Sequence, residues 1–370
     1  MAGPHSPPFR ADQVGSLLRP PELKKARQDF KNGKITAANL KAVEDREIRR
    51  AVAMQEAAGL EGITDGEFRR AFWHVDFLTG FEGIAATQGQ YALKFHGEGG
   101  AESETRSMMV VNGKVKRTKP VMVDAFRFLK SNTSRVAKLC IPAPTYMHMR
   151  GGRKVVDAAV YPDIDEFWAD ITRAYQEEIA DLAAAGCTYL QIDDVSFATL
   201  CDENIRSQVR RDGEDPDKLP AFYASVISGL LKNKPENMHV TMHTCRGNHA
   251  SMWMAEGGYD AVAEGIFQTA VDGFFLEYDT ARAGGFEPLR HVPRGKRVVL
   301  GLISTKKREL ESRTELKRRI DEAAKFVPLD DLCLSPQCGF ASSEVGNKLS
   351  EDDQKRKLEL AVQVAAEVWG

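Results

Sequence analysis

The sequence lacks a long apolar run. No stretch of about 18 apolar residues occurs in its 370 residues, so we expect no transmembrane helix. Residues 1–9 hold three prolines and no apolar segment, which is unlike a secretory signal peptide, and we expect these residues to be disordered. These absences predict a cytoplasmic protein that has no membrane partner.

An excess of one charge is also absent. The chain has 51 Lys and Arg against 53 Asp and Glu, which gives a formal net charge of -2. Short basic runs at 306–308 and 317–319 are interpreted as solvated helix surface, because nucleic acid requires a clustered basic face. We therefore expect no nucleic-acid partner, and a homo-oligomer is compatible with the composition.

Closely paired cysteines are missing as well. The six cysteines contain no Cys-x-x-Cys, and a reducing compartment disfavours disulfides. Cys140, Cys187 and Cys333 lie within or beside apolar runs and are interpreted as core, whereas Cys201 is left open. The two remaining cysteines, Cys245 and Cys338, are candidates for chemistry.

Short apolar runs alternate with amphipathic segments along the chain. The runs expected to form buried strands are Asp12–Gly15, Leu60–Thr64, Ala137–Ile141, Thr188–Ile192, His239–Met242, Gly273–Leu276, Val298–Leu302 and Asp331–Leu334. Helical periodicity is expected at Ile164–Ala185, Glu309–Phe326 and Glu351–Val368. Eight strands separated mostly by helices predict a single catalytic domain over residues 1–370, an α/β fold of the (β/α)8 TIM-barrel type. A doubly wound open sheet is the alternative, since periodicity does not show closure.

One connection is much longer than the others. About seventy residues separate the second expected strand from the third, and we predict that 71–135 form an insertion over the barrel mouth. Within it, Asn112-Gly113 stands between two alternating runs, Met108–Val111 and Lys114–Arg117. Because Asn-Gly is a strong two-residue hairpin signal, we predict a β-hairpin that turns at this dipeptide.

Polar residues follow six of the expected strands, at the end where barrel enzymes place their chemistry. They are Gly15-Ser16, Asp65-Gly66-Glu67, Asp193-Asp194, His243-Thr244-Cys245, Glu277-Tyr278-Asp279 and Ser335-Pro336-Gln337-Cys338-Gly339. The recurrence of polar residues at six strand ends indicates a functional site more strongly than any single motif does.

Four of these residues suit one metal ion. His243 and Cys245 are two apart on an extended segment, so their side chains point the same way. Glu277 ends an apolar run, where an unpaired carboxylate would be costly, and Cys338 lies in a turn just past another. One nitrogen, two sulfurs and one oxygen suit tetrahedral Zn²⁺, whereas four independent residues without a metal are the alternative.

The ligand set also predicts the reaction. Ligands from distant strands indicate a catalytic zinc, and two thiolates with a carboxylate cancel more than the charge of Zn²⁺. Such a zinc activates water poorly but still lowers the pKa of an incoming thiol. Glu277 is the weakest donor and is expected to loosen when the thiol enters. We therefore predict S-alkylation of a small thiol, with no catalytic side chain beyond the zinc ligands.

With these motifs in this order, the sequence resembles the cobalamin-independent methionine synthase family, in particular its C-terminal catalytic barrel. The resemblance spans nearly the whole chain and implies a zinc-dependent methyltransferase of methionine biosynthesis, which passes a methyl group from a methyl-folate to homocysteine. It places the zinc ligands at His243, Cys245, Glu277 and Cys338. It also implies that homocysteine is held at Ser16, Glu67 and Asp193, where the acidic side chains pair with the ammonium and the backbone near Ser16 receives the carboxylate.

The chain departs from the large members of that family on the donor side. It has no room for their second barrel, residues 142–147 lack their tryptophan, and Ser304-Thr305-Lys306 replaces an Asp and a His. The donor is therefore left open among a folate, a corrinoid carrier and an epoxide, with an epoxide:coenzyme M type of thiol transferase as the alternative enzyme. A zinc store or scaffold is the non-enzymatic alternative.

Two further features near the expected site have two interpretations each. Arg246 is expected to bind the acceptor's carboxylate or sulfonate, or else to be an arginine behind the metal ligands. Phe72-Trp73-His74 is interpreted either as an aromatic wall for the electrophile or as core packing.

Overall fold

The protein is built around one curled parallel sheet, seen in a computed structural model that describes residues 6–370. The strand order is β1-β4-β5-β6-β7-β8-β9. These strands are β1 (Gly62–Ile63), β4 (Val136–Pro142), β5 (Tyr189–Asp194), β6 (His239–Thr244), β7 (Gly273–Glu277), β8 (Arg297–Ile303) and β9 (Leu332–Pro336). Every residue of β5, β7, β8 and β9 is buried, as in a parallel sheet covered on both faces.

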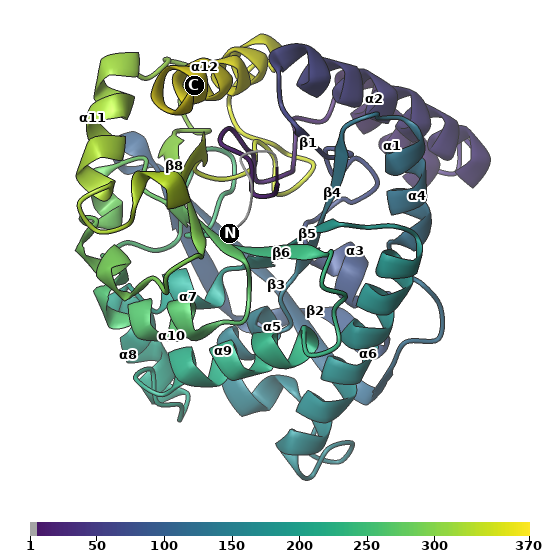
Figure 1. Cartoon of the computed structure of the whole chain (residues 1–370). Helices are drawn as coiled ribbons and strands as arrows, with labels where there is room; N and C mark the ends of the chain where they lie inside the picture. The colour runs from purple at the N-terminus through teal and green to yellow at the C-terminus, as the bar shows by residue number, and fades with distance from the viewer. Residues whose placement is uncertain (1–5) are drawn as a thin grey trace.

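Helices surround the sheet (Figure 1). They are α1 (Pro21–Lys31), α2 (Ala37–Ala58), α3 (Val75–Leu78), α4 (Val123–Ser131), α5 (Thr145–Met149), α6 (Ile164–Ala184), α7 (Ser196–Thr199), α8 (Glu203–Arg211), α9 (Leu219–Leu230), α10 (Ala263–Gln268), α11 (Arg313–Ala323) and α12 (Glu351–Trp369). The last helix, α12, packs against α2, which closes the ring. None of the helices within residues 6–370 combines the length and apolar character needed to cross a lipid bilayer. The α/β barrel prediction is confirmed in architecture.

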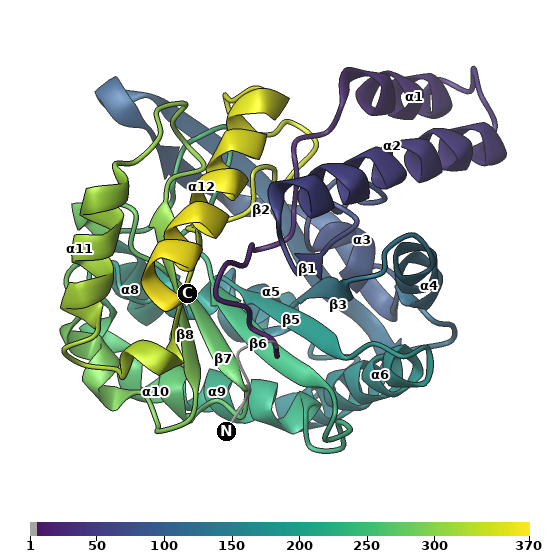
Figure 2. The same cartoon turned by 45° about the horizontal axis from the view of Figure 1, so that its top comes forward.

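The first expected strand is absent. Residues 12–15 form no strand, and the neighbouring Ala11 makes an isolated parallel bridge with Leu334 of β9. The reason is local: the Asp12 carboxylate accepts the backbone N–H groups of Phe9 and Gln13, which removes both from any ladder. Figure 2 shows this segment, in dark purple, running into the middle of the curled sheet. It thus occupies the eighth position of the barrel without being a strand.

The start of the described chain is packed. We expected disorder over residues 1–9, yet Phe9 is only 4% exposed. Arg297 donates hydrogen bonds of 2.7 Å to the carbonyls of Ser6 and Pro8. Apolar burial and these two bonds hold Ser6–Phe9 in place, and residues 1–5 lie outside the described part of the chain.

The long connection contains a β-hairpin, as predicted, but its turn is elsewhere. Strands β2 (Glu82–His96) and β3 (Glu102–Lys116) pair antiparallel and turn at Glu98–Gly100. Asn112-Gly113 lies inside β3, opposite an irregularity between Glu82 and Ile84. Gly83 has φ +82°, and a β-carbon there would lie 2.5 Å from the Gly113 carbonyl oxygen. Gly113 therefore lies at a β-bulge, where the backbones of the two strands approach each other closely.

The predicted helices are present with small shifts. Helix α6 matches its prediction, and Gly186 follows it with φ +86°, as expected of a glycine just past a helix end. Helix α11 begins at Arg313 rather than Glu309. Glu311 is used in the preceding loop, where its carboxylate accepts the Ser304 N–H at 2.9 Å.

Candidate metal centre and thiol site

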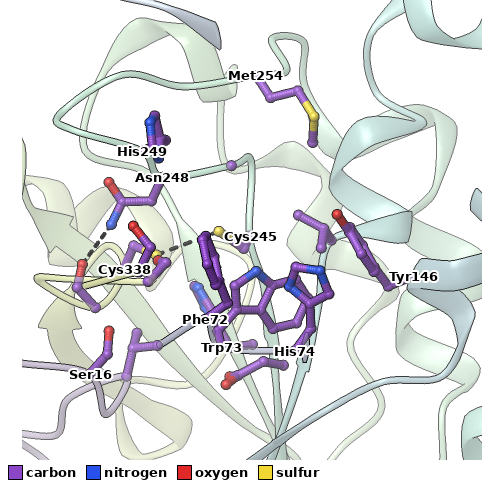
Figure 3. Close-up of a pocket in the computed structure, with 18 of the residues that line it drawn as sticks. Ser16, Phe72, Trp73, His74, Tyr146, Cys245, Asn248, His249, Met254 and Cys338 are labelled. Atoms are coloured by element: carbon purple, nitrogen blue, oxygen red, sulfur yellow. Dashed lines mark hydrogen bonds between the residues drawn. The ribbon is translucent and has the colours of Figure 1, made fainter. Parts of the chain in front are cut away.

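The four predicted metal ligands lie together at the carboxyl ends of three strands. His243 is near the end of β6, Cys245 follows that strand, Glu277 ends β7, and Cys338 stands two residues after β9. Their ligand atoms all lie within 4.8 Å of one another. Figure 3 shows the two cysteines facing each other, with their sulfur atoms 3.5 Å apart.

These residues fit a zinc ion. Both ring nitrogens of His243 and one carboxylate oxygen of Glu277 are buried and have no hydrogen-bond partner among the described residues. Buried polar atoms without a hydrogen-bond partner are rare in native interiors. The other Glu277 oxygen accepts the Arg246 backbone N–H at 3.0 Å, which fixes the carboxylate. A nitrogen, two sulfurs and an oxygen within this distance form the donor set of a tetrahedral zinc site.

The two cysteines have opposite electrostatic tendencies. The hydrogen bond from Cys245 lowers the pKa of the Cys338 thiol well below its ordinary value, and His243 lowers it further against the effect of burial. The same hydrogen bond raises the pKa of Cys245 well above its ordinary value. Within this hydrogen-bonded pair, Cys338 is therefore the cysteine that more readily forms a thiolate.

Arg246 lies behind this group of ligands. Its side chain is fully buried, and the guanidinium carbon stands 4.4 Å from the centre of the Tyr259 ring. Arg246 is not among the residues that line the cavity above the metal ligands. Of the two interpretations of this residue, its position matches the arginine behind the ligands.

Glu67 and Asp193 meet beside the metal ligands. A carboxylate oxygen of each and the sulfur of Cys140 lie within 4.8 Å of one another. Burial raises the pKa of Glu67 to about 7, and the nearby Asp193 adds to the rise while Arg70 opposes it. Burial likewise raises the pKa of Asp193 to about 6 against the effect of His243. Two close buried carboxylates favour a bound cation, because each ionised form needs a counter-charge.

The third member of this group is a thiol that is turned toward the backbone. Cys140 donates to the Val14 carbonyl at 3.0 Å, and burial raises the pKa of its thiol well above the ordinary value. The charged members of the group are therefore the two carboxylates, whose oxygens are the acceptors that an ammonium group requires.

Sequence analysis missed the side chains that hold these carboxylates. The Arg70 guanidinium, which is 2% exposed, lies 3.4 Å from a carboxylate oxygen of Glu67. The side-chain amide of Gln191 donates a hydrogen bond of 2.7 Å to the Asp193 carboxylate. Gln191 is two residues before Asp193 on β5, so strand periodicity could have placed both on one face. Nothing in the sequence distinguished Arg70 from Arg69. Glu67 itself has φ +61°, a strained backbone conformation of the kind that gathers at functional sites.

Ser16 packs against the turn that contains Cys338. A β-carbon at Gly339, the residue after Cys338, would lie 1.9 Å from the Ser16 hydroxyl, so the two segments are in close contact. The Phe340 N–H donates to the Ser16 carbonyl at 2.8 Å. This contact brings Ser16 to the wall of the same cavity as the carboxylates and the metal ligands.

The remaining wall of the cavity is aromatic. Phe72, Trp73, His74 and Tyr146 line it (Figure 3), with Leu93 and Phe95 from the hairpin strand β2. The rings of His74 and Tyr146 are 4.4 Å apart. Burial lowers the pKa of His74 to about 3, so its imidazole is neutral. Of the two interpretations of residues 72–74, the cavity wall matches their position, and the hairpin contributes to it.

Fold and site together define a class: an α/β barrel with a candidate metal centre of two cysteines, a histidine and a glutamate, and a pair of buried carboxylates, at the carboxyl ends of its strands. The family sequence model that describes the catalytic domain of cobalamin-independent synthases matches residues 9–367 of this chain. The chain belongs to this family, as its motifs predicted.

Relatives fall into two groups. The uncharacterized proteins YxjH and YxjG of Bacillus subtilis are 45% and 44% identical, each over 98% of this chain and 95% of their own length. A 5-methyltetrahydropteroyltriglutamate–homocysteine methyltransferase of Thermotoga maritima is 22% identical over 90% of this chain, but only 42% of its own length is covered. The chain therefore spans less than half of that large methyltransferase.

Solved structures share the whole fold. A Listeria monocytogenes protein assigned as a vitamin-B12-independent methionine synthase is 38% identical, with a TM-score of 0.78 over 98% of both chains. A B12-independent methionine synthase of Shewanella, solved with selenomethionine, has a TM-score of 0.70 at 20% identity over 97% of both chains. The latter likeness concerns the fold alone.

Proposed function

We propose that this protein is a zinc-dependent S-methyltransferase whose acceptor is homocysteine or a closely related small thiol. The observation that carries the proposal is the placement of the ligand atoms of His243, Cys245, Glu277 and Cys338 within 4.8 Å of one another. Three of these residues, His243, Cys245 and Cys338, line a cavity that the Glu67–Asp193 pair also lines. A metal site for sulfur and a site for an ammonium thus share one cavity. Homocysteine carries both groups, a thiol and an α-ammonium.

The chain's own side chains supply orientation and charge. A zinc ion held by the four ligands would lower the pKa of the incoming thiol, so that it loses its proton near neutral pH. Glu67 and Asp193 hold the acceptor ammonium, and Arg70 and Gln191 hold those carboxylates in place. The acceptor sulfur then forms a bond to the methyl carbon while the bond from that carbon to the donor breaks.

The cavity favours an amino-acid thiol over a sulfonated one. Among the described residues, no lysine or arginine lines this cavity, and its charged groups include the acidic Glu67, Asp193 and Asp194. A sulfonate such as that of coenzyme M would need a cation there. The coenzyme M type of transferase is therefore the weaker of the two enzyme hypotheses.

Product analysis tests the proposal. The zinc-loaded protein is incubated with homocysteine or coenzyme M, and each is paired with methyltetrahydrofolate, methylcobalamin or epoxypropane. We expect methionine, detected by mass spectrometry, from homocysteine and a methyl donor. A thioether formed only from coenzyme M and the epoxide would support the alternative enzyme. If no thiol is alkylated and thiols leave the zinc-edge absorption spectrum unchanged, the site is not a catalytic one.

The carboxylate pair predicts a pH dependence of amino-acid binding. Both pKa values are raised, to about 7 for Glu67 and about 6 for Asp193, so both groups are ionised above this window and neutral below it. Affinity for the ammonium should fall as the pH drops from 8 to 5, by up to about tenfold per pH unit for each ionisation. Methionine is the ligand to titrate, because it has the ammonium but no thiol to ionise. The affinity for 4-(methylthio)butanoate, which lacks the ammonium, should change little over the same pH range. Equal pH profiles for the two ligands would contradict the assignment of Glu67 and Asp193 to the ammonium.

A further inference from the structure

A second cavity, with a volume of ≈ 470 Å³, lies beside the metal ligands and plays no part in the proposed reaction. Its walls come from the tip of the β2–β3 hairpin and from the loops that follow β6, β7, β8 and β9. We propose that this cavity is a binding site for a small oxyanion, a carboxylate or a phosphate.

Three buried hydrogen-bond donors belong to residues of this cavity and have no partner among the described residues. They are the Thr280 hydroxyl, the Arg282 Nε and the Lys306 Nζ. Lys306 is only 9% exposed, so its ammonium is largely removed from water. A buried donor without an acceptor is costly, and a hydroxyl, a guanidinium and an ammonium are all groups that donate hydrogen bonds to an oxyanion.

The charges in the cavity leave a positive balance. Arg282 pairs with Asp279 at 2.9 Å, and Lys307 pairs with Glu98. Lys306 and the exposed Lys348 have no carboxylate within ion-pair distance among the described residues. The lining residues thus comprise four cationic side chains, Arg282, Lys306, Lys307 and Lys348, and two acidic ones, Glu98 and Asp279. This positive balance in one concave surface favours an anion over a neutral ligand.

A wall separates this cavity from the one that contains the thiol site. Hydrogen bonds of 2.7 and 2.9 Å join the backbones of His96 in the hairpin and Trp253 in the loop after β6. The two cavities have no lining residue in common. They are nevertheless neighbours, because the Arg282 guanidinium lies 4.0 Å from the Glu277 carboxylate. An oxyanion bound to Arg282 would therefore stand close to a metal ligand without entering the acceptor site.

Trp253 provides a direct reporter. It lines the cavity, and the Arg282 guanidinium carbon stands 4.8 Å from the centre of its ring. The zinc-loaded protein is titrated with succinate and, separately, with phosphate at constant ionic strength, with chloride as the control anion. We expect a saturable change in tryptophan fluorescence that Trp253→Phe abolishes. Tighter binding of succinate would indicate a carboxylate ligand, and tighter binding of phosphate would indicate a phosphate ligand.

Two variants locate the site. Lys306→Met should weaken the anion about tenfold or more, since it removes a charged donor, and Thr280→Val should weaken it by a smaller factor. Lys325→Met, which alters an exposed lysine outside the cavity, should bind as the parent does. Thr280→Val is nearly isosteric and gives an answer even if Lys306→Met folds poorly. The absence of a saturable change with either anion, a signal that persists in Trp253→Phe, or unchanged affinity in folded Lys306→Met and Thr280→Val would overturn the proposal.

Discussion

Replacing Cys338 with alanine is expected to remove most of the zinc from the purified protein and to abolish thiol alkylation. Cys338 is the ligand whose pKa is lowered, so its loss deletes the thiolate that is most available to a metal. Loss of a partner outside the ligand set typically weakens metal binding by 10–100-fold, so loss of a ligand should exceed about a hundredfold. Zinc per chain, measured by mass spectrometry after exposure to a weak chelator, should fall from about one to a small fraction.

A second cysteine provides the matched control. Cys333 is also fully buried and lies in β9, five positions before Cys338 in the chain, but its side chain faces Val14, Phe275 and Val299. Cys333→Ala should keep its zinc and lose about 1 kcal/mol of stability for a small buried side chain. Equal zinc contents in the two variants would refute the assignment of Cys338 as a ligand.

Asp193→Asn is expected to lower kcat/KM for homocysteine by roughly a hundredfold. Removing one partner of a buried charge pair costs about 2–5 kcal/mol, and each 1.4 kcal/mol is about tenfold. The loss should depend on the ammonium of the acceptor. The parent protein should therefore prefer homocysteine to 4-mercaptobutanoate, which has the same thiol and carboxylate, and the variant should lose most of that preference.

The neighbouring aspartate separates positioning from general damage. Asp194 is equally buried, but its carboxylate accepts the Thr145 hydroxyl at 2.6 Å and the Phe197 N–H at 2.9 Å. Asp194→Asn should lower the melting temperature while the preference for homocysteine remains. If Asp193→Asn retained the full preference, the ammonium would be bound elsewhere.

Much of the barrel followed from periodicity alone. Strands such as β5 and β8 are buried along their whole length, and polar residues stand at or just after their carboxyl ends, so both their type and their orientation were predictable. The exceptions have local causes that periodicity does not detect. Asp12 uses its side chain to bind its own backbone, and Gly113 serves a bulge instead of a turn.

The candidate site divides in the same way. The spacing of His243 and Cys245, and the positions of Glu277 and Cys338 at strand ends, predicted that the four metal ligands lie together. This prediction did not depend on whether the sheet closes into a barrel. The side-chain direction of Arg246 could not be predicted, because the residue after a ligand can point into the cavity or away from it, and the packing against Tyr259 is a tertiary contact. The hairpin's contribution to the cavity, through Leu93 and Phe95, depends on a tertiary contact that no local pattern encodes.

The closure of the barrel by a non-strand segment has a consequence for folding. Ala11 pairs with Leu334, and Ser16 packs against Gly339, so residues that are far apart in the sequence must meet before the barrel closes. Contacts of such long sequence separation form late, after the entropy of closing the intervening chain has been overcome. Cys338 joins the other ligands only at that stage. The proposed binding of zinc and of the acceptor therefore depends on the same late folding step, which completes the ligand set and closes the cavity.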